Sequence, residues 1–181
     1  LFIILEVGGV LAEYTSRIPI KSEDIEKLIL EISEVTNSDE ICEIINGSDL
    51  SKDNKNLLNK VAKSDNLNKN IREALATNLL EEKEGKISKS LLKTDLVAKV
   101  GSGCGLLGTL IPLGPGLSAL GTGDVVSLSA QLIIAFNTTT VGLASGSIAY
   151  VISKIRRGWY EEEISAAYTL TNAILEVNYG D

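Results

Sequence analysis

Long apolar segments alternate with charged segments along this chain. Residues 100–123 and 130–152 contain no Asp, Glu, Lys or Arg, and each has about the twenty residues that a helix needs to cross a bilayer core. Both segments are rich in Gly, Ala, Ser and Thr, which is typical of helices that pack closely against other membrane helices. The linking segment, GTGDVVSLS, is expected to form a short turn. The pattern therefore predicts a transmembrane helical hairpin over residues 100–152.

The chain begins with a shorter apolar run, LFIILEVGGVLAEY, which is interrupted by Glu6 and Glu13. This run is too short to cross a membrane by itself. We expect residues 1–16 to be the end of a truncated first transmembrane helix. The sequence contains no methionine, so we also expect it to begin inside a longer protein.

Residues 17–99 have the pattern of amphipathic helices. Apolar side chains recur at spacings of three and four between charged residues, namely Ile25, Leu28, Ile29, Ile32 and Val35, then Leu57, Leu58 and Val61, then Ile71, Leu75, Leu79 and Leu80. Ser51 with Asp53 is typical of a helix start, and Asn37 and the Asn-Gly-Ser group at 46–48 indicate breaks. We predict a helical insert outside the membrane at 17–99 and a further helix at 153–181.

The positions of the basic residues predict the orientation of the hairpin. They flank it on both sides, with Lys86, Lys89, Lys93 and Lys99 before it and Lys154, Arg156 and Arg157 after it. The connecting turn has only Asp124. Because basic residues favour the cytoplasmic side, we expect the insert and the C-terminal helix to be cytoplasmic and the turn to be external. The fold class that follows is an all-α, multi-pass protein of the cytoplasmic (inner) membrane.

Composition excludes several classes of function. The formal net charge is -7, so the chain offers no basic surface for nucleic acid. There is no histidine, which limits proton chemistry within the chain to carboxylates and lysines. Cys42 and Cys104 lie far apart in different contexts, so we expect neither a disulfide framework nor a metal site.

The glycine-rich stretch GSGCGLLGTLIPLGPGL could be either a phosphate-binding loop or a helix-packing surface. A phosphate loop requires a preceding strand and usually a following Lys, and the pattern predicts neither. We therefore expect helix contacts at Gly105, Gly108 and Gly142. Pro112 and Pro115 lie in the first span and predict a kink, or a hydrated passage beside one.

Polar residues inside the apolar segments are the candidates for an ion path. Thr109 lies in the first span, and Asn137, Thr138, Thr139 and Thr140 follow one another in the second. Four consecutive polar residues cannot all bond to one face of their own helix, so at least one is expected to face a neighbouring helix or a water-filled pore. Glu6 is the other candidate, either as an intramembrane acid or as a group that reaches the interface.

Two segments, GLLGTLIPLGPGL and AFNTTTVGLASGSIAYVISKIRRGWYEE, together resemble the MotA/TolQ/ExbB proton-channel family of membrane motor subunits. The resemblance implies a homo-oligomeric ring of five such chains around single-span partners of the MotB/TolR/ExbD kind. The partner would supply an essential membrane aspartate, and the transported species would be H⁺ or Na⁺ without another cofactor. The resemblance thus implies an ion-conducting subunit rather than an enzyme.

By motif, the threonines expected to face the partner are Thr109 and Thr139, with Thr138 and Asn137 beside them. The sequence departs from the family at one position: related chains often have an acid about one turn before the second threonine, and here that residue is Ile134. This difference leaves sodium as an alternative to the proton. A non-conducting membrane scaffold, in which the small residues only pack helices, is the alternative function.

Overall fold

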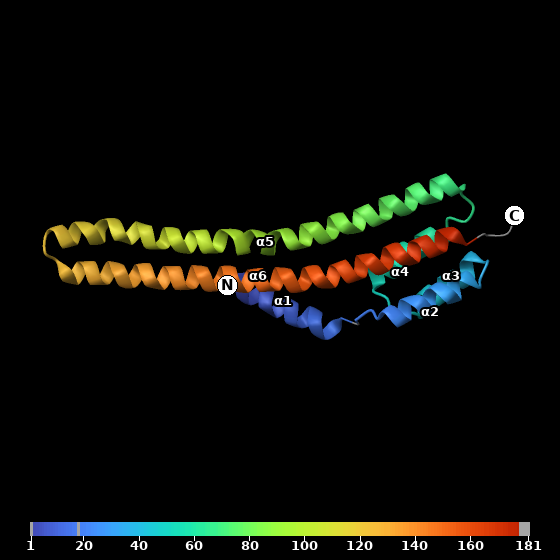
Figure 1. The fold of residues 1–181 in the computed structure, drawn as a ribbon, viewed down its shortest axis with the longest axis horizontal. Helices are drawn as coiled ribbons and strands as arrows, with labels where there is room; N and C mark the ends of the chain where they lie inside the picture. Colours follow the sequence, from blue (N-terminus) through green and yellow to red (C-terminus); the bar gives the residue numbers. More distant parts are fainter. Residues whose placement is uncertain (1, 18, 178–181) are drawn as a thin grey trace. The chain divides into compact units, whose positions relative to one another are not determined.

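The computed structural model describes residues 2–17 and 19–177, and every regular element among them is a helix. The elements are α1 (Phe2–Ser16), α2 (Ser22–Ser33), α3 (Ser38–Gly47), α4 (Lys52–Ala62), α5 (Lys69–Gly121) and α6 (Val125–Glu176) (Figure 1). The chain divides into two compact units. The hairpin unit contains Lys89–Arg157 and the N-terminal segment up to Tyr14, and the bundle unit contains Thr15–Ser88 and the segment from Gly158 onward.

In the hairpin unit, α5 and α6 run antiparallel and side by side (Figure 1). The turn between them is shorter than the sequence predicts, because α6 already begins at Val125. Asp124 explains the early start: its Oδ1 accepts a hydrogen bond from the Ser127 amide at 3.0 Å, and its Oδ2 accepts one from the Ser127 hydroxyl at 2.5 Å. These two bonds make Asp124 the N-cap of α6.

Both hairpin helices are long and apolar enough to cross a membrane. In their most apolar stretches only 11% (α5) and 17% (α6) is buried within this chain, so most of this apolar surface is not covered by the rest of the chain. Large side chains such as Ile111, Val126 and Phe136 are exposed on their outer faces. Such surfaces require lipid or other apolar protein to cover them.

The bundle unit has its own hydrophobic core. Asn37 and Ser51 accept hydrogen bonds from the amides of Asp39 and Asn54, and so cap α3 and α4. The core is formed by α2, α3, α4, the first part of α5 and the last part of α6, with buried Leu28, Ile32, Ile41, Cys42, Ile45, Leu57, Leu58, Val61, Ala62, Ala76, Leu80, Ala167, Leu170 and Ile174.

Two features of the bundle unit add to the sequence-based picture. Leu170 and Ile174, in the last part of α6, are fully buried in the same core as the insert, so this part of α6 packs with the insert. Ile71, which is one of the periodic apolar positions, is 50% exposed. It lies in the first turn of α5, where the chain has only just entered the helix after the Asn68 cap.

Candidate functional site

Glycines bring the backbones of α5 and α6 into direct contact. A Cβ atom added at Gly105 would lie 2.9 Å from the Gly142 Cα, and one added at Gly101 would lie 3.3 Å from the Gly146 Cα. At both positions the neighbouring atom is backbone, which cannot rotate away as a side chain can. The two helices therefore approach at a distance that only glycine permits at these crossings.

Of Thr109 and Thr139, the two threonines expected to face the ion path, only Thr139 directs its hydroxyl at the other helix. The Thr139 hydroxyl lies 3.2 Å from the Gly105 carbonyl oxygen of α5 and 3.0 Å from the Ala135 carbonyl oxygen of its own helix. In the regular bonding pattern of α5, the Thr109 amide donates to the same Gly105 carbonyl. The Thr109 hydroxyl donates to the Leu106 carbonyl at 2.5 Å.

The neighbours of Thr139 point in different directions. The Thr138 hydroxyl lies 2.9 Å from the Gly108 carbonyl oxygen of α5. Thr140 bonds back to the Phe136 carbonyl of its own helix at 2.8 Å, and Asn137 is exposed on this chain. The structure thus brings Thr138 and Thr139 to the contact with α5 and leaves Asn137 on the outer surface.

The two prolines lie within α5, which continues as a helix through both of them. Pro112 is buried and Pro115 is exposed. Because proline has no amide hydrogen, Pro112 cannot donate to the carbonyl of Gly108, four residues earlier. The same carbonyl is the one that the Thr138 hydroxyl approaches.

Glu6 lies in an ion-pair cluster with Arg156 of α6. Its carboxylate accepts hydrogen bonds from Arg156 Nη1 at 2.9 Å and from the Thr94 hydroxyl at 3.2 Å. Arg156 also binds Glu13 through Nε at 3.0 Å. The side chains of Arg156 and Glu6 are 14% and 19% exposed, so this pair is shielded from water on this chain.

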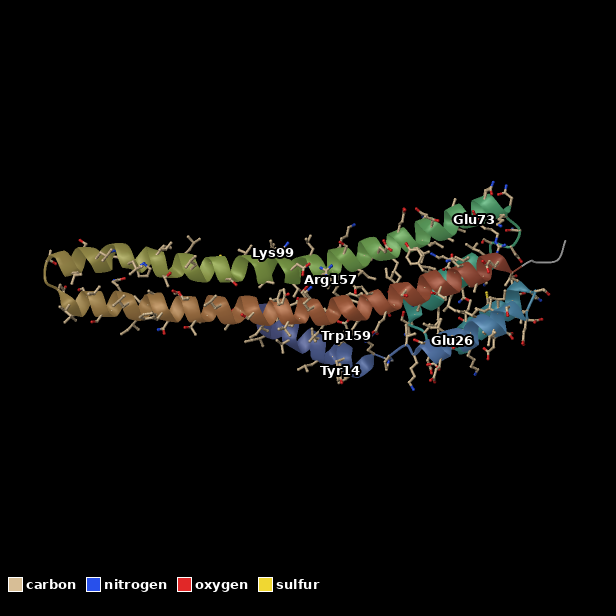
Figure 2. The ribbon with its side chains drawn as sticks, viewed as in Figure 1. Tyr14, Glu26, Glu73, Lys99, Arg157 and Trp159 are labelled. Atoms are coloured by element: carbon tan, nitrogen blue, oxygen red, sulfur yellow. The ribbon has the colours of Figure 1, made fainter. Side chains whose placement is uncertain are left out.

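A second ion pair lies nearby in the same unit. Arg157, which is labelled in Figure 2, donates from Nη2 to Asp95 Oδ2 at 2.9 Å, and the Ser153 hydroxyl bonds to the other oxygen of Asp95. Sequence reasoning used Arg156 and Arg157 only as orientation signals. It missed their partners, and the one available signal was that Glu6 and Glu13, seven residues apart, lie on one face of a helix.

The bundle unit contains a buried polar group of three residues. Lys83 binds the Asn54 side-chain oxygen and lies 3.5 Å from Glu163 Oε2, and Asn54 donates to the Glu163 carbonyl at 3.2 Å. Burial lowers the pKa of Lys83 from its ordinary value, and the negative charge of Glu163 acts in the opposite direction. This group ties α4, α5 and α6 together inside the bundle.

Arg17 provides a further tie within the bundle unit. Its guanidinium lies 5.2 Å from the ring centroid of Trp159 and binds Glu162 at 2.6 Å. Trp159 is labelled in Figure 2. The contact is a cation–π interaction combined with an ion pair, and it attaches the segment that follows α1 to α6.

Within the part of the chain that the structure describes, no group of His, Cys, Asp and Glu is arranged to hold a metal ion. Cys42 and Cys104 are both free thiols. The chemistry that the site offers is therefore that of hydroxyl and carbonyl oxygens between two apolar helices. Such oxygens can solvate a small cation or support a chain of water molecules.

A comparison with known protein families gives a match. Residues 49–168 match the sequence model of the MotA/TolQ/ExbB proton channel family. The matched region contains the apolar stretches of both candidate spans and about half of the bundle unit. No curated protein and no solved structure matches the chain significantly.

Proposed function

Because the chain belongs to the MotA/TolQ/ExbB proton channel family, we propose that it is the ion-conducting subunit of a membrane motor driven by a proton or sodium gradient. Ions pass along the hydroxyl and carbonyl oxygens near Thr109 and Thr139, and their passage moves a single-span partner relative to the ring. The transported ion is the only cofactor in this proposal, and the chain catalyses no covalent reaction.

The observation that carries the proposal is that the Thr139 hydroxyl lies 3.2 Å from the Gly105 carbonyl oxygen of α5, while the Thr109 hydroxyl of α5 donates to the Leu106 carbonyl. Hydroxyl and carbonyl oxygens therefore lie close together within the otherwise apolar stretches of α5 and α6. Oxygens that are not charged can replace part of an ion's hydration shell without trapping the ion.

The proposed assembly is a homo-oligomer, a ring of five chains as the resemblance implies. The outer faces of α5 and α6 support it, because their large apolar side chains must be covered by lipid or by neighbouring subunits. The hairpin unit contains no acid between residues 100 and 152 apart from Asp124, at the turn. A partner of the MotB/TolR/ExbD kind would therefore supply the membrane aspartate.

In the proposed topology, the bundle unit is cytoplasmic and the turn at Asp124 is external. Lysines and arginines flank the spans on the side of the bundle, and basic residues favour the cytoplasmic face. The protein would be a multi-pass protein of the cytoplasmic membrane.

The test compares three variants in cells that also express a single-span partner of the MotB/TolR/ExbD kind. Thr139→Val and Thr109→Val remove a hydroxyl at nearly constant volume, and both are expected to abolish the driven movement while native mass spectrometry still detects the oligomer. Thr140→Val is the matched control, because its hydroxyl bonds only within α6. Full activity of both Thr139→Val and Thr109→Val would contradict the proposal.

A second candidate is a non-conducting scaffold. It is favoured by one observation, that the Thr139 hydroxyl is already within hydrogen-bonding distance of two carbonyl groups. In a scaffold, Thr139→Val would lower the stability of the oligomer and would have no separate effect on ion movement. The assembly measurement in the same experiment distinguishes the two functions.

A further inference from the structure

Thr138 occupies a position that the ion path does not explain. Its hydroxyl lies 2.9 Å from the Gly108 carbonyl oxygen, and 3.0 Å from each of the Ile134 and Ala135 carbonyl oxygens. A hydroxyl group has one hydrogen to donate, so it can satisfy only one of the three at a time.

The three carbonyls differ in what else binds them. Within α6, the carbonyls of Ile134 and Ala135 accept the amides four residues later, as in any regular α-helix. The carbonyl of Gly108 has no such partner, because the residue four positions later is Pro112. An unsatisfied carbonyl in an apolar environment is costly. A hydrogen bond from the Thr138 hydroxyl therefore stabilises the Gly108 carbonyl more than the carbonyls of Ile134 or Ala135.

The side chain can reach this carbonyl only because residue 108 is glycine. A Cβ atom added at Gly108 would lie 2.8 Å from both Cβ and Oγ1 of Thr138. The three residues thus have complementary roles. Pro112 leaves the Gly108 carbonyl without its backbone donor, the absence of a side chain at Gly108 leaves space beside it, and Thr138 places its hydroxyl in that space.

We propose that Thr138 is a positioning residue that replaces, across the hairpin, the backbone hydrogen bond lost at Pro112, and that it is not a ligand of the transported ion. The bond fixes the register of α5 against α6 one helical turn from Gly105. The consequence for Thr109 and Thr139 rests on the proposed function, whereas the hydrogen bond itself does not.

The test is a double-mutant cycle on the full chain in lipid nanodiscs. Thr138→Val removes the donor at nearly constant volume, and Pro112→Ala restores the backbone amide. We expect Thr138→Val to raise the unfolding equilibrium constant about tenfold, as for a carbonyl left unpaired in an apolar membrane environment. In the Pro112→Ala background the same substitution is expected to have little effect. Equal effects in the two backgrounds would overturn the proposal.

Carbonyl chemical shifts give a direct readout that a general packing role would not produce. Labelling glycine carbonyls with ¹³C and threonine amides with ¹⁵N selects the Gly-Thr pairs, which are Gly108–Thr109 and Gly121–Thr122. In Thr138→Val the Gly108 signal should move upfield, while the Gly121 signal serves as the internal reference. Thr138→Ser, which keeps the hydroxyl, should leave both signals near their original positions. An unchanged Gly108 signal in Thr138→Val would refute the hydrogen bond.

Ion flux then separates positioning from ion binding. Any loss of flux in Thr138→Val should be recovered in the Pro112→Ala background, whereas the loss in Thr139→Val should not be. If the chain conducts no ions in any form, the proposed function fails while the chemical-shift result still stands. If flux in Thr138→Val is lost and Pro112→Ala does not restore it, Thr138 acts on the ion path and the proposal is wrong.

Discussion

Arg156 and Glu6 form an ion pair at 2.9 Å, although they are 150 positions apart in the sequence. The pair attaches α1 to the end of the hairpin, where Arg156 also binds Glu13. Because both members of the Arg156–Glu6 pair are largely shielded from water, removing one of them leaves the other charge without its partner in a medium of low dielectric constant.

Arg156→Gln is therefore expected to destabilise the hairpin unit by roughly 2 kcal/mol or more, since it leaves two carboxylates facing each other. Glu6→Gln should cost less, because Arg156 keeps Glu13 as a partner. The loss of stability in each variant can be measured by thermal unfolding in mild detergent. Lys99→Gln, at an exposed position of α5, is the control. Equal melting temperatures for Arg156→Gln and this control would contradict the assignment.

The backbone contact between α5 and α6 predicts an overpacking effect at Gly105. Gly105→Ala would bring a Cβ atom to 2.9 Å from the Gly142 Cα, and relieving this clash should cost about 1–3 kcal/mol. Gly103→Ala, two residues away in a position with open space, should be neutral. The measurement is the resistance of the oligomer to dissociation by detergent. If the two alanine variants behave alike, the helices do not touch at Gly105.

The buried Lys83 predicts a pH dependence in the bundle unit. Burial lowers its folded-state pKa below the ordinary value of 10.5, so the unfolded chain binds more protons just below pH 10.5. Stability should therefore rise with pH in this alkaline window, relative to Lys83→Met, because the cost of burying the charge is relieved. The change in stability with pH can be measured by denaturant unfolding, followed by the fluorescence of Trp159, the only tryptophan.

Lys60→Met, at an exposed position of α4, serves as the control for Lys83→Met. The difference in the free energy of unfolding between wild type and Lys60→Met should stay constant over the same pH range. If the difference in the free energy of unfolding between wild type and Lys83→Met is also constant with pH, Lys83 is not desolvated in the folded protein.

The proposed orientation predicts which cysteines an impermeant reagent can reach. With Cys42 and Cys104 replaced by serine, Thr122→Cys in the turn should react with a charged maleimide in right-side-out vesicles. Ser90→Cys, at an exposed position of α5 before the spans, should react only after the vesicles are opened. The reverse labelling pattern would invert the topology.

Hydropathy and charge alone predict much of this fold. The hairpin, the helix start at Ser51 and the helical insert follow from local patterns. The helix lengths do not, because α5 and α6 continue far beyond their apolar stretches into the bundle unit. Hydropathy marks where a helix becomes apolar, and it does not mark where the helix ends.

The pairing of residues across the hairpin could not be predicted in the same way. The sequence pattern groups Thr138 with Thr139 as candidates for the ion path and predicts a kink at Pro112. Their connection through Gly108 depends on the register of α5 against α6, which no spacing within one helix encodes. The pairing of Arg156 with Glu6 depends on tertiary contacts in the same way.

The central claim is that ions cross the membrane beside Thr139 when the partner is present. The most direct measurement is proton and sodium flux into liposomes that contain the purified complex of this chain with its single-span partner. The account predicts gradient-driven flux of one of these ions in the complex. It predicts a background rate for the chain alone and for the Thr139→Val complex, with Thr140→Val close to wild type. Substantial flux through the chain without a partner, or unchanged flux in the Thr139→Val complex, would contradict it.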